Sequence, residues 1–231
     1  MIQVDLLNIR HIDLNTLLRA FKPILPAEVI EKTSQYKNPA DQLRHLAGEI
    51  LSRVSIKNHT GFYPDVQFLC SEHGKPYIDH QKVEFNISHS GDYVVLALSE
   101  QNVGVDIEKL RHNKMRVARR FFSDTEIDLL KGSDSPDQDF TKLWSLKEAY
   151  LKFSGSGLTE ALNTFTVRES KQSNVFEVYD SAGIKINIRL FHKMIDNGYF
   201  LSVCFHEDQY IDRIKETTLQ ELLKFATNYE K

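Results

Sequence analysis

Three strand-like segments follow one another closely in the middle of the chain, and they limit the possible folds more than any other feature. They cover residues 84–88, 92–99 and 103–108, with Gly91 and then Gln101 and Asn102 between them. Short turns that contain glycine or asparagine are typical of connections between neighbouring strands. The sequence therefore predicts a sheet built from consecutive segments at the centre of the chain.

Segments with helical or strand-like periodicity lie on both sides of this sheet. Helices are expected over residues 12–35 with a break at Pro23 and Pro26, and over 39–56, 109–122, 139–153 and from Thr217 onward. Further strands are expected over residues 2–8, 65–69, 163–168, 174–179, 184–191 and 198–205. Ser123 followed by Glu126 has the form of a capping box. This mixture predicts an α+β fold.

Two strand openings resemble each other. Gly91-Asp92-Tyr93 precedes one apolar strand, and Gly198-Tyr199 precedes another late in the second half. The similarity favours two similar α+β subdomains, which we place at residues 1–102 and 103–231. Chance similarity is the alternative, because strands share a common composition.

Composition excludes several classes of protein. The chain of 231 residues has a formal net charge of −3, so no overall positive field favours nucleic acid. No segment approaches the ~20 apolar residues of a membrane span, and the N-terminus has no secretory cleavage pattern. Cys70 and Cys204 form no metal-ligand spacing, and the histidines show no zinc motif. We expect a soluble, cytoplasmic protein that binds neither membrane nor nucleic acid.

A pair of carboxylates on one strand is the first candidate site. Residues two apart on a strand point to the same face, so Asp106 and Glu108 project together while Val105 and Ile107 face the core. Neighbouring carboxylates repel each other and gain from a cation between them, and Mg²⁺ prefers such oxygen ligands. The alternative is an exposed strand face that is acidic by chance.

Two other clusters have both a functional and a structural interpretation. Glu148 and Lys152 lie one turn apart on a helix, where they suit either a metal and phosphate site or a surface ion pair. The run from Ser88 through His89 to Ser90 ends a strand, and its hydroxyl, imidazole and amide groups suit an anion. A tight turn with local hydrogen bonds is the alternative for that run.

Taken together and in this order, the clusters resemble the Sfp-type 4′-phosphopantetheinyl transferases. The matching segments are FNISHSGDYVVLALS (85–99), VGVDIE (103–108), RRFFSDTE (119–126) and LWSLKEAYLKFSGSGL (143–158). The turn GKPY (74–77) and the segment RHLAG (44–48) fit the family's first half. Each motif is weak alone, whereas their joint occurrence over residues 26–160 is specific.

The resemblance implies a reaction, a fold and a set of roles. Family members transfer the phosphopantetheine arm of coenzyme A to a serine of an apo acyl or peptidyl carrier protein and release 3′,5′-ADP. Coenzyme A lies in the cleft between two similar subdomains of a monomer. By matching position, Asp106, Glu108 and Glu148 would hold Mg²⁺, or Mn²⁺ in its place. Lys152 would lie near the pyrophosphate, and Glu148 or Glu108 would take the proton of the carrier serine.

The resemblance also implies contacts to the nucleotide end of coenzyme A. Ser88 and His89 match residues that contact it, with His89 at the 3′-phosphate. Lys75 falls in the GKP turn, which approaches coenzyme A as well. Arg44 and Lys32 match basic residues that hold the 3′-phosphate, whereas Val29 stands where the family has a second lysine.

Alternatives remain at the level of function. A non-catalytic module that binds carrier proteins with the same fold is one, although the intact acidic triad and Lys152 argue against it. A nucleic-acid-binding protein that uses the basic run 109–122 is another, and the net charge argues against that. The basic run instead suits an acidic carrier protein or a solvated surface. The motifs leave fatty acid, polyketide and nonribosomal peptide carriers equally open.

Overall fold

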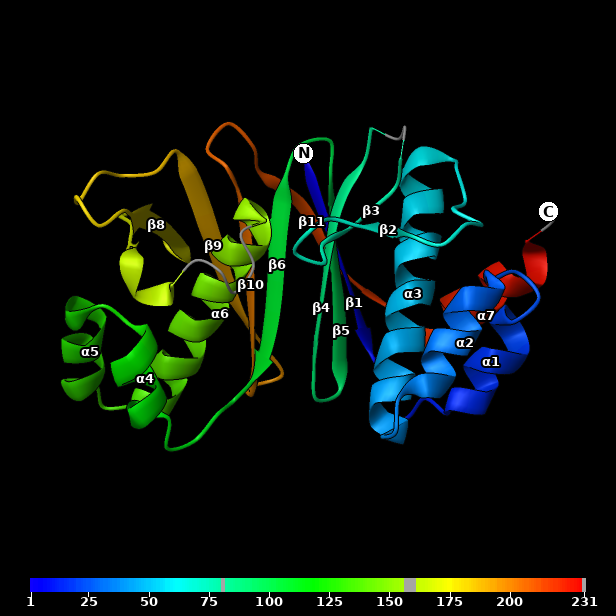
Figure 1. Ribbon diagram of the computed structural model, residues 1–231, viewed down its shortest axis with the longest axis horizontal. Helices are drawn as coiled ribbons and strands as arrows, with labels where there is room; N and C mark the ends of the chain where they lie inside the picture. The colour runs from blue at the N-terminus through cyan, green and yellow to red at the C-terminus, as the bar shows by residue number, and fades with distance from the viewer. Residues whose placement is uncertain (80–81, 156–160, 230–231) are drawn as a thin grey trace.

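The computed structural model describes residues 1–79, 82–155 and 161–229, and it arranges them as two sheets between two sets of helices (Figure 1). The motif residues 156–158 lie outside the described residues. Helices α1, α2, α3 and α7 lie on one side of the strands, and α4, α5 and α6 lie on the other. The predicted α+β class is confirmed.

The first sheet has four strands and belongs mainly to the first half of the chain. Its order is β11-β1-β5-β4, and β11 is parallel to β1 whereas the other pairs are antiparallel. Its strands are β1 (Ile2–Asn8), β4 (Glu84–Ser90), β5 (Tyr93–Ser99) and β11 (Ile211–Thr217). The helices packed against it are α1 (Leu14–Phe21), α2 (Ala27–Gln35), α3 (Pro39–Thr60) and α7 (Leu219–Asn228).

The second sheet has five antiparallel strands in the order β6-β10-β9-β8-β7. They are β6 (Val103–Lys109), β7 (Thr166–Glu169), β8 (Val175–Tyr179), β9 (Ile188–Ile195) and β10 (Tyr199–His206). Its helices are α4 (Met115–Phe121), α5 (Asp124–Lys131) and α6 (Pro136–Ser154), followed by the short 3₁₀ helix η2 (Leu162–Thr164). Ser123 and Glu126 form the predicted capping box at the start of α5.

The inner faces of the two sheets pack on each other in a third core. Alternate residues of β1, such as Val4, meet alternate residues of β6, such as Val105 and Ile107. This confirms the predicted inward direction of Val105 and Ile107, because a strand alternates its side chains between faces. Asp106 and Glu108 therefore point away from this core, toward α6.

Side chains rather than backbone ladders join the two sheets where β4 runs beside β6. Every second residue of β4 accepts a hydrogen bond from an amide of β6, with Asn86 Oδ1, Ser88 Oγ and Ser90 Oγ paired to Val105, Ile107 and Lys109 at 2.9, 3.3 and 3.1 Å. These contacts satisfy the edge of β6 and leave β4 and β6 in a fixed register. The three polar residues of the NISHS motif thus form the junction between the halves.

The internal repeat seen in the sequence corresponds to a reciprocal pair of tyrosines. The ring centroids of Tyr93 and Tyr199 lie 4.8 Å apart. The Tyr199 hydroxyl donates to Asp92 at 2.9 Å, and the Tyr93 hydroxyl donates to Asp196. Each tyrosine begins the second strand of its hairpin and reaches the turn of the other hairpin. The repeat therefore places equivalent residues on either side of the central core.

Two expectations about local structure are wrong, and one strand was not expected. Residues 65–69 do not form a strand, since the short β2 (Leu69–Cys70) begins only at the end of that segment and pairs with β3 (Pro76–Tyr77). Residues 109–114 are not helical: β6 extends to Lys109, and α4 begins at Met115. Strand β11 is missing from our expectations because its charged, mostly exposed residues give no alternating pattern.

Candidate functional site

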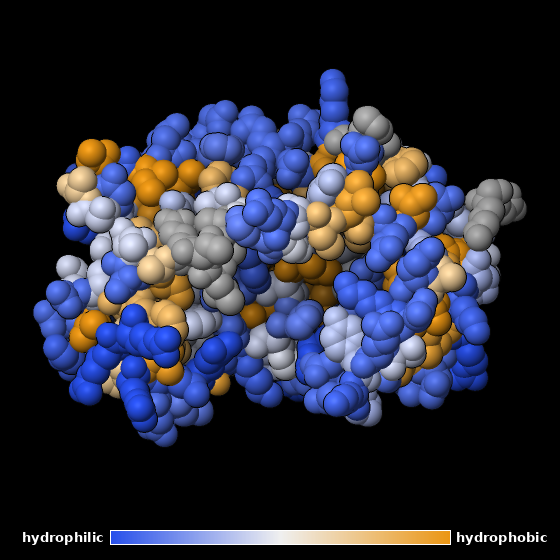
Figure 2. All heavy atoms as spheres, in the orientation of Figure 1, coloured by the Kyte–Doolittle hydropathy of each residue, from blue (hydrophilic) through white to orange (hydrophobic). Residues whose placement is uncertain are grey.

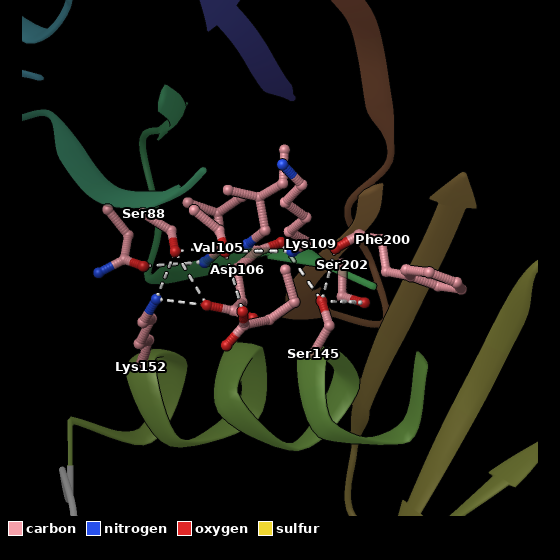
Figure 3. Close-up of polar contacts among 12 residues, drawn as sticks. Ser88, Val105, Asp106, Lys109, Ser145, Lys152, Phe200 and Ser202 are labelled. Atoms are coloured by element: carbon pink, nitrogen blue, oxygen red, sulfur yellow. Dashed lines mark hydrogen bonds and ion pairs between the residues drawn. The ribbon is translucent and has the colours of Figure 1, made fainter. Parts of the chain in front are cut away.

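The close approach of α6 to β6 creates the candidate active site. A Cβ atom on Gly104 would lie 2.1 Å from the carbonyl oxygen of Ala149 and 2.5 Å from the amide nitrogen of Phe153, so only glycine fits here. The face of α6 that carries Ser145, Glu148 and Lys152 then lies over the strand. Ser145 fixes that face, because its hydroxyl donates to the carbonyl of Phe200 at 3.0 Å (Figure 3).

Asp106 is the centre of this site and is only 4% exposed. Its Oδ1 accepts a hydrogen bond from Ser88 Oγ at 2.9 Å and pairs with Lys152 Nζ at 2.7 Å (Figure 3). Lys152 also donates to Ser88 Oγ at 2.8 Å. The second oxygen, Oδ2, is buried without a hydrogen-bond partner. A buried carboxylate oxygen with no donor is suited to a cation.

Glu108 lies on the same face of β6 and has its own partners. Ser90 Oγ donates to one of its oxygens at 3.1 Å, and Arg111 pairs with the other. The Arg111 guanidinium in turn stacks over Trp144, 5.4 Å from the ring centroid. Burial and the charge of Asp106 raise the pKa of Glu108, and Arg111 opposes that shift.

Glu148 completes the acidic group from the helix side. Burial and the charges of Asp106 and Glu108 raise the pKa of Glu148, whereas Lys152 and Arg111 lower it. The three carboxylates therefore interact electrostatically, as like charges in a partly buried site do. Within residues 1–79, 82–155 and 161–229, no three acidic, histidine or cysteine side chains are already arranged around a point as ligands. Two of the carboxylates are held by Lys152 and Arg111 instead.

These residues nevertheless fit a hard divalent cation. All the donors are carboxylate oxygens, Asp106 Oδ2 is free of other partners, and the repulsion among the carboxylates would be relieved by a positive ion. Lys152 is 28% exposed and Arg111 37% exposed in their side chains, so both have room to move. The set is suited to Mg²⁺ if these two side chains give way.

A cationic cavity in the first half lies between α2, α3 and β4. It has a volume of about 210 Å³, and its lining includes the basic residues Lys32, Arg44 and His89, after which we name it, as well as Glu28 and Glu49. Arg44 is held by Asp41 at 2.5 Å and by the carbonyl of Gly91 at 3.2 Å. Burial and then the charges of Arg44 and Lys152 lower the pKa of His89. In Figure 2 the surface is hollowed between the two halves.

A second cavity, of about 250 Å³, lies between the first half and the C-terminal end of α6. Lys75 and Lys152 both line it, and it shares Gly74, Pro76 and Ile87 with the cationic cavity. Lys75 Nζ is engaged by Asn102 and lies 3.3 Å from the carbonyl of Val103 and 3.7 Å from Glu84. Lys75 therefore lies beside Lys152 rather than with Lys32, Arg44 and His89.

Ser88 and His89 diverge although they are adjacent in the sequence. Ser88 faces Asp106 and Lys152, whereas His89 lines the cationic cavity. The alternation of side chains along β4 explains this difference. The structure thus brings Asp106, Glu108, Glu148, Lys152 and Ser88 together, and Lys32, Arg44 and His89 together elsewhere.

Two residues at these sites were not among the predicted site residues. Arg111 belongs to the basic run but pairs with Glu108, and its position three residues after Glu108 was the available signal. His45 lines the cationic cavity within the RHLAG segment. No periodicity distinguishes such a histidine from one in the core, because its environment depends on α2 and β4.

Comparisons with known proteins show which family the chain resembles. A model of the 4′-phosphopantetheinyl transferase superfamily matches residues 102–204, and a model of the N-terminal part of 4′-phosphopantetheinyl transferases matches residues 14–101. A 4′-phosphopantetheinyl transferase of Bacillus subtilis is 36% identical over 202 residues, which cover 85% of this chain and 89% of that protein. The 4′-phosphopantetheinyl transferase Sfp of Bacillus subtilis strain 168 is 33% identical over 207 residues, covering 88% and 92%.

A solved structure is more distant. The holo-[acyl-carrier-protein] synthase of Thermotoga maritima matches 47% of this chain and 64% of its own, with a TM-score of 0.39 and 19% identity.

Proposed function

Because the chain belongs to the Sfp-type 4′-phosphopantetheinyl transferase family, we propose that Asp106, Glu108, Glu148 and Lys152 form the active site at which it transfers phosphopantetheine from coenzyme A to carrier proteins. The observation that carries this assignment is the arrangement around Asp106. There Lys152, Ser88 and a free carboxylate oxygen meet at the junction of the two halves.

The cationic cavity is the proposed site for the nucleotide end of coenzyme A. Lys32, Arg44 and His89 are the groups that would hold the 3′-phosphate, since Lys and Arg are favourable partners for phosphate oxygens. The second cavity leads from there to Lys152, so the pyrophosphate would lie beside it. Lys75 and Ser88 would border this path, with Ser88 orienting Lys152 and Asp106.

The proposed metal is Mg²⁺, held by Asp106, Glu108 and Glu148. When bound there, it would neutralise charge on the pyrophosphate during transfer. Lys152 would leave Asp106 for the pyrophosphate oxygens, and Arg111 would loosen its contact with Glu108. Both movements are possible because these side chains are partly exposed.

The carrier serine attacks the phosphorus that bears pantetheine, and the bond from that phosphorus to the bridging oxygen breaks. Glu148 is the better placed base, because Glu108 is held by both Ser90 and Arg111. The pKa of Glu148 is raised, as is that of Glu108, and this favours acceptance of a proton by either carboxylate. Lys152 would stabilise the leaving 3′,5′-ADP.

Helix α4 and the residue before it are the proposed docking surface for an acidic carrier protein. Arg116, Arg119 and Arg120 are exposed and Lys114 is partly exposed. Figure 2 shows strongly hydrophilic side chains over this part of the surface.

None of the described helices has the length and apolar composition that a membrane span requires. We further propose a cytoplasmic monomer, since one chain supplies both cavities and all three carboxylates.

The direct test is incubation with coenzyme A, Mg²⁺ and a panel of apo carrier proteins, followed by intact mass measurement. We expect a mass increase of one phosphopantetheine on at least one carrier and none in a chelator. Binding of a carrier without any mass increase across the panel would instead favour a non-catalytic binding module.

A further inference from the structure

A histidine in the cationic cavity is held in one tautomer by its neighbour. Thr33 Oγ donates its only proton to the carbonyl of Val29, 2.7 Å away. His45 Nδ1 lies 3.0 Å from the same hydroxyl oxygen. A hydroxyl has one proton, so with that proton on the shorter contact to Val29 we assign a proton to Nδ1, which then donates to Thr33. A neutral His45 therefore has a bare acceptor at Nε2.

The Nε2 atom of His45 is buried and without a hydrogen-bond partner. The nearest acidic atom is Oε1 of Glu49 at 4.0 Å, and the other oxygen of Glu49 pairs with Arg53. The ring of Tyr36 lies 5.1 Å from the imidazole and covers it. A buried acceptor without a donor is unfavourable, so this atom would gain from a proton or a donor.

The charges around His45 oppose its protonation while the cavity has no anion in it. Burial lowers the pKa of His45, as do Lys32 on α2, His89 on β4 and Arg53 on α3, whereas Glu49 on α3 raises it. Glu28 on α2 and Arg44 on α3 also line the cavity. The imidazole is therefore neutral beside a group of cations.

We propose that His45 takes up a proton at Nε2 when a phosphate group occupies this cavity, so that nucleotide binding here is coupled to protonation. The inference rests on the proposed function of the cavity as a nucleotide site. A phosphate held by Lys32, Arg44 and His89 offsets the positive charge of Lys32 and Arg53, which acts together with burial to keep His45 neutral. The imidazolium then interacts with both the phosphate and Glu49.

The coupling has a defined sign. Phosphate binding raises the pKa of His45, so affinity for the nucleotide is greater when His45 is protonated and falls as the pH rises. His45→Gln removes the titrating group, and His59→Gln, at an exposed position on the same helix, is the matched control. From about pH 8 to about pH 6, wild-type affinity should increase relative to His45→Gln by roughly threefold to tenfold.

The probe is adenosine 3′,5′-bisphosphate, with binding measured by calorimetry in buffers of different ionisation enthalpy. Its phosphates also titrate near pH 6, but the titration of the free ligand is the same with both proteins and cancels in the ratio. His59→Gln should behave as wild type. His45→Gln should bind with less proton uptake.

Nuclear magnetic resonance of protein labelled with nitrogen-15 histidine gives the decisive measurement. We expect the Nδ1–H tautomer of His45 in the free protein and protons on both nitrogens at saturation. Saturable binding with unchanged His45 signals, or an Nε2–H tautomer in the free protein, would overturn the coupling and leave the nucleotide site intact. Absence of saturable binding would overturn the assignment of the cavity itself, and the coupling with it.

Discussion

The two halves of the molecule hold their charges in opposite ways. In the first half, Lys32, Arg44 and His89 gather around a cavity, and Arg44 is fixed in place by Asp41 and a carbonyl. In the second half, the charged groups pair with one another: Asp106 with Lys152, and Glu108 with Arg111.

This difference indicates an order of events. A phosphate can reach Lys32 and His89 without breaking an ion pair between described residues, although Arg44 is paired with Asp41, whereas use of the carboxylates requires Lys152 and Arg111 to exchange partners. The nucleotide end of coenzyme A should therefore supply binding energy, and the acidic site should act only once the pyrophosphate draws Lys152 away. Each prediction below separates these two roles.

The largest effect is expected at the acidic site. Asp106→Asn or Glu148→Gln should lower kcat/KM by about a thousandfold or more, because each replaces a negatively charged carboxylate of the proposed metal site with a neutral amide. The folded state should survive, as judged by circular dichroism. Asp128→Asn, on the exposed side of α5, is the matched control and should be fully active. Full activity of both site variants in the presence of a chelator would refute the proposed metal site.

Substitution of two lysines on α6, Lys147 and Lys152, should affect stability in one case and turnover in the other. Lys147 is fully buried, pairs with Glu126 at 3.0 Å and donates to the carbonyls of Leu162 and Phe165, both at 2.8 Å. Lys147→Met leaves the Glu126 charge buried and should lower the free energy of unfolding by about 3–5 kcal/mol. Lys152→Met should remove turnover with a smaller loss of stability, because the Lys152 side chain is 28% exposed whereas that of Lys147 is fully buried.

Urea unfolding and single-turnover transfer measure these two effects. Equal loss of stability in both lysine variants would show that Lys152 is as structural as Lys147.

Comparison of coenzyme A with dephospho-coenzyme A, which lacks the 3′-phosphate, tests whether the cationic cavity of the first half binds that phosphate. Dephospho-coenzyme A should be a poorer substrate than coenzyme A for the wild type, and His89→Ala should narrow that difference by roughly tenfold. Lys75→Met should leave the difference unchanged, since Lys75 Nζ is held by Asn102 and lies in the other cavity. Ratios of kcat/KM for the two substrates provide the measurement. If His89→Ala still prefers coenzyme A to dephospho-coenzyme A as strongly as the wild type does, His89 does not contact the 3′-phosphate.

The smallest effect is expected at the proposed docking surface. Reversal of Lys114 and Arg116 to glutamate should raise KM for the carrier by about threefold to tenfold and flatten the salt dependence of kcat/KM. Affinity for coenzyme A should hardly change, because α4 lines neither cavity. Carrier kinetics measured from low to high salt give the result. Unchanged carrier kinetics at low salt would show that this surface does not bind the carrier and is an ordinary solvated face.

Local rules predicted much of the fold. The two-residue period of a strand placed Asp106 and Glu108 on the face opposite Val105, and the capping box at Ser123 began α5 as expected. The same period separates Ser88 from His89, although the motif groups them together. The helix expected over 109–114 fails because charge composition does not fix backbone conformation, and β6 instead extends to pair Lys109 with Tyr199.

The sequence by itself determined which residues share a face and which family the motifs resemble, because both depend on neighbours along the chain. Only the tertiary structure decided the partners of the charged groups. Arg111 pairs with Glu108, Lys75 with Asn102, and β11 with β1 across the full length of the chain. Such pairings depend on where the packing of three cores places distant segments, and a long flexible side chain takes whichever charged or polar partner this packing places within reach.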